Sequence, residues 1–299
     1  MSRKMLGNLL LILTAMIWGT AFVGQRVGME SIEPFTFTAA RMALAAIAVG
    51  TVAMLLTGRR AGTAAAEATD AAYMKNTLVG GVCCGVFLSA GSLFQQAGVV
   101  YTTAGKAGFI TAMYMLLVPV INFLLFKKKN SLRVWMAVLI GVAGMYILCV
   151  KEGFSLTTGD TLVLICAFMF SGHILCCDHF APRGDAIMIS AIQFAVTSVI
   201  SAVFAFIFED PTWDKIVSAA IPILYCGLIS GGLGYTLQIV AQKFTDPTIA
   251  SLLMSLESVF AVIAGALLLG ERMSMQELIG CAVMFFAIIL VQLPEKKKL

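Results

Sequence analysis

Charged residues are scarce in this chain. Only 12% of its 299 residues are Asp, Glu, Lys or Arg, whereas a soluble domain carries about 25%. Hydrophobic residues make up 60% and the mean hydropathy is +0.96. These values exclude a soluble domain and indicate a polytopic membrane protein. The net charge of +4 does not indicate nucleic-acid binding, because the basic residues lie in short segments between apolar runs.

The motifs of several enzyme classes are also missing. The sequence has no Walker-type phosphate loop, no nucleophile elbow and no His-Glu-x-x-His, which argues against ATP-driven pumping by this chain. Its eight cysteines form no Cys-x-x-Cys pair and lie in or at the ends of apolar segments. We therefore interpret them as reduced packing residues without redox or zinc function. We expect no enzyme activity, no cofactor and no metal.

Ten apolar runs are long enough to cross a bilayer. A segment alone in lipid must satisfy its own backbone hydrogen bonds, so each run is expected to be a helix. We predict an all-α polytopic membrane protein with spans at 6–27, 35–57, 77–99, 103–126, 131–150, 161–177, 186–208, 216–240, 247–270 and 275–293. The one long polar link, 58–76, is expected to be a mobile loop. Most of the 20 lysines and arginines fall on the side of the N-terminus, which predicts a multi-pass protein of the cytoplasmic membrane with both termini in the cytoplasm.

The two halves of the chain correspond to each other. A shift of 143 residues lays 80–148 on 223–291 without a gap. Each half, 1–150 and 151–299, has five spans, so the second half must enter the membrane in the opposite orientation. The three lysines at 127–129 accordingly correspond to the Gly-Glu-Arg at 270–272, where most of the positive charge is lost. We predict two inverted five-helix repeats in one integrated transmembrane domain, with a site near the midplane between them.

Glu257 is the strongest candidate site residue. Counted from Pro247 at about 1.5 Å per helical residue, it lies roughly 15 Å deep, near the middle of a hydrocarbon layer about 30 Å thick. A carboxylate at this depth is costly unless it is paired, hydrated or protonated, so such residues usually face a cavity. The other interpretation is a structural carboxylate tied to hydroxyl groups between helices.

The 143-residue shift makes Tyr114 the counterpart of Glu257, so we expect the two side chains to face each other. Arg41 lies six residues into the second span, where three roles are open. It can bind an anionic group of a substrate, pair with Glu257, or extend to the outer interface. Pairing would disfavour proton coupling through Glu257, whereas an isolated Glu257 in a dry pocket would favour it.

Three further residues are predicted to line the cavity, namely Trp18, Gln95 and Tyr235. The glycine-rich stretch Gly231–Gly234 in the eighth span is predicted to be a flexible point, because small residues let helices approach and bend.

Several short motifs resemble one known family. The chain has Ile-Trp-Gly-Thr-Ala-Phe at 17–22, Arg41 in the second span, and Ser-Leu-Glu-Ser-Val-Phe-Ala followed by Leu-Leu-Gly-Glu within 255–271. These motifs and the ten spans resemble the EamA family of the drug/metabolite transporter superfamily. Similar proteins usually follow the glutamate with proline, whereas this chain has Ser258, which questions a kink there. The resemblance implies a secondary transporter of small metabolites, often amino acids or related compounds and often outward, with spans five and ten peripheral to the cavity.

The main hypothesis is alternating access of a central cavity to the two sides of the membrane. The expected partners are a small-molecule substrate, membrane lipids and either a coupling proton or no coupling ion, in a monomer or a homodimer. One alternative is an intramembrane enzyme acting on a lipid or isoprenoid through His173, Asp178 and His179. A passive channel is another.

Overall fold

The computed structural model describes residues 2–60, 71–99, 101, 104–150, 157–269 and 273–293. Within these ranges every regular element is a helix, and ten helical spans are long and apolar enough to cross a membrane. The predicted all-α, ten-span fold is therefore confirmed. The expected loop at 58–76 is partly helical, because hydropathy detects only the apolar part of a helix and misses its polar ends. Residues 61–70 and the Gly-Glu-Arg at 270–272 lie outside the described residues.

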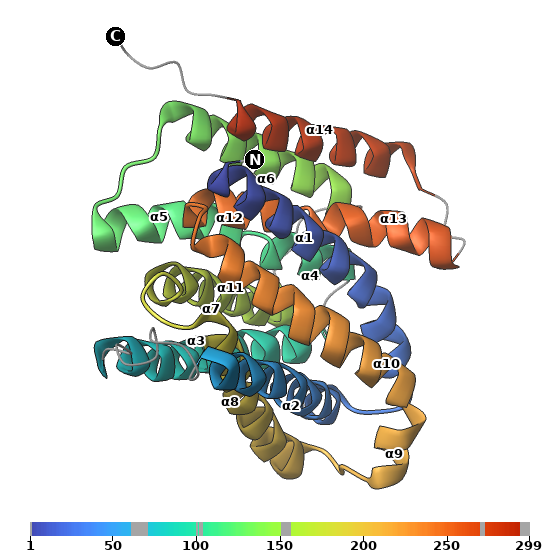
Figure 1. Ribbon diagram of the computed structural model, residues 1–299. Helices are drawn as coiled ribbons and strands as arrows, with labels where there is room; N and C mark the ends of the chain where they lie inside the picture. The colour runs from blue at the N-terminus through green and yellow to red at the C-terminus, as the bar shows by residue number, and fades with distance from the viewer. Residues whose placement is uncertain are drawn as a thin grey trace.

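The helices follow one another without a strand among the described residues (Figure 1). They are α1 (Arg3–Gly28), α2 (Pro34–Arg60), α3 (Ala71–Val99), α4 (Ala104–Thr111), α5 (Tyr114–Phe126), α6 (Leu132–Cys149), α7 (Thr158–Phe180), α8 (Ala186–Phe208), α9 (Trp213–Ser218), α10 (Ala220–Leu224), η2 (Tyr225–Tyr235), α11 (Thr236–Gln242), α12 (Pro247–Met254), α13 (Glu257–Leu269) and α14 (Met275–Gln292).

Two spans are interrupted at matching positions. The fourth breaks at 112–113, between α4 and α5, and the ninth breaks at 255–256, between α12 and α13. The two breaks are 143 residues apart, and Tyr114 and Glu257 begin the helical segments that follow them. No proline adjoins the second break. There the hydroxyl of Ser255 donates to the carbonyl of Leu252 at 2.8 Å, a local bond that competes with the helical pattern.

The eighth span changes its helical pitch. Its central part, η2, is a π-helix, and the predicted flexible stretch Gly231–Gly234 lies in it. Wider π-turns are rare and are frequently found at functional sites. Glycine is required at Gly234, because an added Cβ would lie 2.7 Å from the indole nitrogen of Trp18. At Gly234 the backbone of η2 therefore lies directly against the indole ring of Trp18 in α1.

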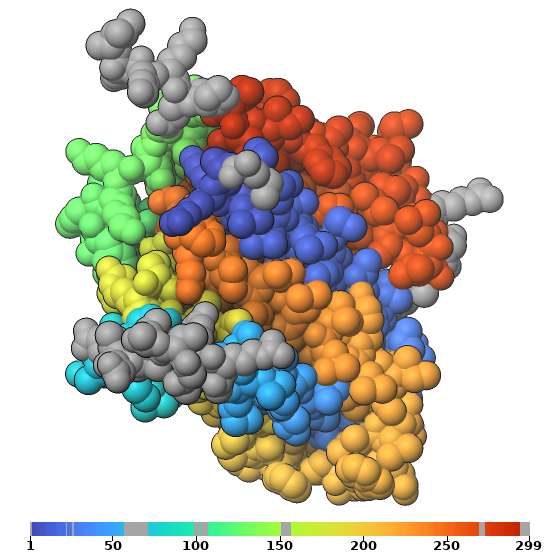
Figure 2. Space-filling model, viewed as in Figure 1, coloured from blue at the N-terminus to red at the C-terminus, as the bar shows by residue number. Residues whose placement is uncertain are grey.

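The first helix of each half packs on the other half. Helix α1 contacts η2, α11, α12 and α13, whereas α7 contacts α3, α4 and α5. In the space-filling view, blue α1 lies between the orange and red segments of the second half (Figure 2). Helix α6 packs against α14 at one edge of the helical bundle, and α2 packs against α8 at the opposite edge (Figure 1). The two halves are thus interlocked.

Candidate functional site

A cavity of about 70 Å³ lies between the two halves of the chain. Its lining residues come from spans one to four, six, eight and nine. Helices α6, α8 and α14 supply none of the described lining residues. The peripheral position expected for spans five and ten is therefore observed. The structure brings together in this lining all six residues singled out from the sequence, which are Trp18, Arg41, Gln95, Tyr114, Tyr235 and Glu257.

Other lining residues were not singled out from the sequence as site residues. They are Gln25, Ser92, Thr111, Phe170, Ile174, Ser230, Gln238 and Met254, together with His173, which was assigned to a different site. The 143-residue shift was the signal that would have found several of them. Four pairs of lining residues are separated by that interval: Ser92 and Tyr235, Gln95 and Gln238, Thr111 and Met254, Tyr114 and Glu257.

Tyr114 and Glu257 face each other, as the shift predicts. The phenol of Tyr114 donates a hydrogen bond of 3.1 Å to Oε1 of Glu257. Tyr114 is buried, and Glu257 is partly buried at the start of α13. Helix α1 packs closely against the backbone of Glu257 and holds it in place. A Cβ added on Gly19 of α1 would lie only 2.7 Å from the Glu257 carbonyl oxygen. The bond joins the fourth span to the ninth across the cavity.

Arg41 is buried without a charged partner. Only 5% of the residue is exposed, and its guanidinium forms no ion pair or hydrogen bond with the residues that the structure describes. The guanidinium carbon lies 5.8 Å from the centre of the Phe37 ring. Pairing with Glu257 is therefore not observed, and the burial is inconsistent with extension to the outer interface. Of the three roles open from the sequence, binding of an anionic group fits this environment.

Aromatic rings form one wall of the cavity. The rings of Trp18 and Tyr235 lie 4.6 Å apart, and Tyr235 makes edge-on contacts with His173 at 5.9 Å and Phe194 at 6.2 Å. The indole N–H of Trp18 donates to the carbonyl of Ser230 at 3.2 Å. These contacts link α1 and η2 and give the cavity a large apolar face next to its charged groups.

The predicted cluster of His173, Asp178 and His179 is not formed. His173 is buried and lines the cavity, Asp178 pairs with Lys128 at 3.3 Å, and His179 is exposed. The reason is helical geometry, because residues five and six positions apart point to different faces of α7. The enzyme alternative thus lacks the arrangement on which it depended.

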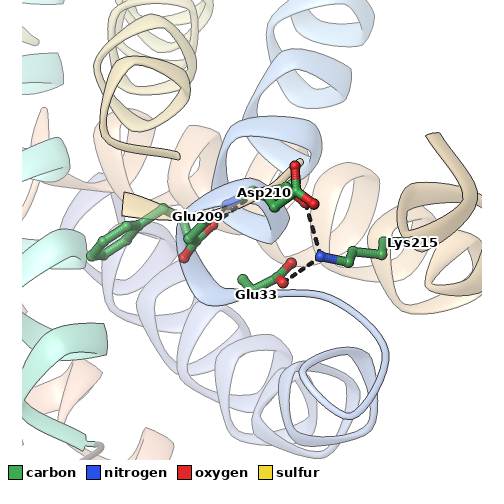
Figure 3. Close-up of polar contacts among 6 residues, drawn as sticks. Glu33, Glu209, Asp210 and Lys215 are labelled. Atoms are coloured by element: carbon green, nitrogen blue, oxygen red, sulfur yellow. Dashed lines mark hydrogen bonds and ion pairs between the residues drawn. The ribbon is translucent and has the colours of Figure 1, made fainter. Parts of the chain in front are cut away.

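A second polar network surrounds the start of α2 and includes Glu33, Glu209, Asp210 and Lys215 (Figure 3). The carboxylate of Glu209, at the end of α8, accepts hydrogen bonds from the backbone N–H groups of Phe35 at 2.8 Å and Thr36 at 2.7 Å. It also accepts from the Thr36 hydroxyl at 2.7 Å. These N–H groups have no partner within the helix, so a residue distant in sequence caps α2.

Lys215 lies between Glu33 and Asp210 in the same network (Figure 3). Its ammonium donates to Oε1 of Glu33 at 2.5 Å and to the backbone carbonyl of Asp210 at 2.8 Å. The hydrogen bond from Lys215 lowers the pKa of Glu33 below its ordinary value, and the same bond raises the pKa of Lys215. Both side chains are about one third exposed, so solvent screens the pair.

The chain is similar to proteins described as transporters. The model of the EamA-like transporter family matches residues 5–150 and 157–293. An uncharacterized transporter of Archaeoglobus fulgidus is 27% identical, over 97% of this chain and 87% of that protein. The uncharacterized transporter YoaV of Bacillus subtilis is 22% identical, over 94% and 93%. A WAT1-related chloroplastic protein of Arabidopsis thaliana is 26% identical, over 93% and 67%.

A solved crystal structure shares the fold. It aligns with a TM-score of 0.77 at 18% identity, over 95% of this chain and 96% of the other.

Proposed function

Because the chain belongs to the EamA-like transporter family, we propose that it is a secondary transporter that exports small metabolites of the amino acid class or related compounds. The family and its relatives support the broader description, a multi-pass membrane transporter. The substrate class and the mechanism are proposed from the chemistry of the cavity, whereas export is the direction that the family resemblance implies.

The observation that carries the proposal is the guanidinium of Arg41 at the cavity, which has no ion pair or hydrogen bond among the described residues. A buried cation without a partner is unfavourable by several kcal/mol, and a ligand carboxylate would offset that cost with charge-assisted hydrogen bonds. Glu257 offers the opposite charge for an ammonium group, and Trp18 and Tyr235 offer an apolar surface between the two. A small zwitterion matches this set of groups.

The size of the cavity supports a cycle of opening and closing. Binding pockets for small molecules usually measure about 300–1,000 Å³, whereas this cavity has about 70 Å³. A metabolite therefore fits only after the helices around it separate, and we assign this conformation to a narrow state of the cycle. The breaks at 112–113 and 255–256 and the π-helix η2 offer places where the spans can bend.

The inverted repeat forms part of the same proposal. The four cavity-lining pairs at 143-residue intervals support it, as do the matching breaks in the fourth and ninth spans. In such transporters the two repeats rock about a site held between them. With both termini in the cytoplasm, as the lysines and arginines predict, Glu209 and Lys215 lie at the outer side.

The test begins with ligand stabilisation of the purified protein in detergent. Amino acids and small carboxylates are screened for an increase in Tm, which binding produces by mass action. A compound that stabilises the wild type is then followed in proteoliposomes by exchange of labelled for unlabelled solute. We expect saturable exchange of the unmodified compound, loss of exchange by a factor of ten or more in Arg41→Met and Glu257→Gln, and no loss in the exposed control Asp210→Ala.

Other outcomes distinguish the rival functions. Flux that rises linearly with concentration and shows no exchange indicates a channel. Chemical conversion of the compound, detected by mass spectrometry, indicates an enzyme. Unchanged exchange in both cavity variants at equal protein levels removes Arg41 and Glu257 from the mechanism.

A further inference from the structure

Three metal-ligating side chains meet next to the cavity, on α3 and α7. They are Cys84, His173 and Cys177, and their ligand atoms all lie within 4.8 Å of one another. The sulfur atoms of Cys84 and Cys177 are 3.8 Å apart. The Cys177 sulfur lies 3.7 Å from Nε2 and 4.0 Å from Nδ1 of His173. The two cysteines are fully buried and His173 is 1% exposed.

We propose that Cys84, His173 and Cys177 form a binding site for a divalent cation of the Zn²⁺ type. The sequence did not indicate this site, because its ligands come from two helices and form no Cys-x-x-Cys spacing. His173 and Cys177 are four residues apart on one face of α7, and the packing of α3 against α7 brings Cys84 to them. The site adjoins the transport cavity through His173, but the metal proposal does not depend on the proposed transport function.

The sulfur separation agrees with coordination of one ion. With Zn–S bonds of about 2.3 Å and a tetrahedral angle, two thiolates lie about 3.8 Å apart, which is the separation observed. A Zn–N bond of about 2.0 Å places the imidazole nitrogen about 3.5 Å from each sulfur. In the structure, Nδ1 of His173 lies 4.0 Å from Sγ of Cys177. These two atoms must approach each other by about 0.5 Å to reach the coordinated separation of about 3.5 Å.

A hydrogen bond with Gln193 orients the imidazole of His173. Oε1 of Gln193 on α8 lies 2.9 Å from Nε2 of His173. A carbonyl oxygen only accepts, so Nε2 carries the proton and Nδ1 has the free lone pair. Histidines that bind metals usually donate their second ring N–H to an oxygen in this way. Because His173 also lines the cavity, the cavity offers a route for the ion.

The surroundings favour a divalent ion over a monovalent one. Apolar side chains pack around the two cysteines, among them Ala181, Ile189 and Ile239. Two thiolates and a neutral imidazole balance a charge of +2, whereas a monovalent ion would leave a net negative charge in an apolar region. Binding converts two thiols to thiolates and releases two protons to solvent, so affinity rises with pH.

Co²⁺ and Cd²⁺ are suitable probes for the full-length protein in detergent. The reduced protein is treated with a chelator, freed from it and titrated with either ion. We expect one equivalent to bind with thiolate-to-metal charge-transfer absorption. Cys84→Ala and Cys177→Ala should abolish this absorption, and His173→Gln should weaken binding by a factor of ten or more. The buried cysteine of α14 supplies the matched control, Cys281→Ala, which should bind as the wild type does.

A measurement on the wild-type protein tests the metal site without relying on variants that must fold correctly. X-ray absorption of the Zn²⁺ complex should show two sulfur neighbours at about 2.3 Å and nitrogen or oxygen at about 2.0 Å. A shell of nitrogen and oxygen alone overturns the proposal, as does absorption that survives in Cys84→Ala or disappears in Cys281→Ala. Failure of the reduced wild type to bind one equivalent of either probe also overturns it.

Discussion

Tyr114 and Glu257 are 143 residues apart in the chain, and a hydrogen bond of 3.1 Å joins their side chains at the cavity. Each begins the second segment of an interrupted span. Their hydrogen bond therefore links the break in the fourth span to the break in the ninth span. A substitution of either side chain should affect both breaks.

A double-mutant cycle measures this coupling. Tyr114→Phe removes the donor from a carboxylate inside the protein, which should lower the free energy of unfolding by about 1–3 kcal/mol. Glu257→Gln retains an acceptor and removes the charge, so Tyr114→Phe should cost less in that background. We expect a coupling energy of about 0.5–3 kcal/mol from unfolding in mixed micelles. Tyr146→Phe on α6 is a control with a neutral outcome, and strictly additive effects would contradict the coupling.

Arg41→Met should stabilise the ligand-free protein while it removes ligand binding. Methionine has a similar length and relieves the burial of an unpaired cation, so we expect the free energy of unfolding to rise by about 1 kcal/mol or more. Thermal shift should show a higher Tm without ligand and no further increase with the compound that stabilises the wild type. A lower Tm together with unchanged ligand binding would show that Arg41 is structural.

Gly19→Ala tests the contact between α1 and α13. The added Cβ would lie 2.5 Å from Cβ of Phe260 and 2.7 Å from the carbonyl oxygen of Glu257, so one helix must shift. Overpacking of this kind costs about 1–3 kcal/mol. In Gly50→Ala on α2 the nearest atom would be 3.9 Å away, which makes it the matched control. Unfolding should separate the two variants by at least 1 kcal/mol, and equal stability would refute the tight contact.

The ion pair of Glu33 and Lys215 predicts a dependence on pH. The lowered pKa of Glu33 means that its contribution is present above the ordinary value of 4.5 and is lost as pH falls through the lowered value. The raised pKa of Lys215 means that its contribution is present below 10.5 and is lost as pH rises through the raised value. Lys215→Met should therefore lower Tm slightly at neutral pH.

Acidification through the lowered pKa of Glu33, which lies below 4.5, should remove this difference in Tm. The pH-dependent part should also be missing when Lys215→Met is introduced into a Glu33→Gln background, because the charged partner is gone. A difference that persists unchanged at acidic pH would assign the effect to the bond between Lys215 and the Asp210 carbonyl.

The sequence alone predicted the ten spans, because the length and hydropathy of a membrane helix are set by the bilayer and can be read from local composition. It also predicted that Tyr114 and Glu257 face each other, because a shift of the sequence by 143 residues lays one on the other. Glu257 was detectable for a related reason, since a carboxylate in the middle of an apolar run stands out against its neighbours.

The side chains that meet around these residues are set by the packing of the folded helices. It left Arg41 without an ion pair in the described part of the chain, placed α1 on the second half, and brought Cys84 to His173 and Cys177. In a membrane protein the lipid-facing and the buried faces of a helix are both apolar, so the sequence pattern does not reveal how each helix is rotated against its neighbours. That rotation is set by packing between residues far apart in the chain, and it determines the contents of the cavity.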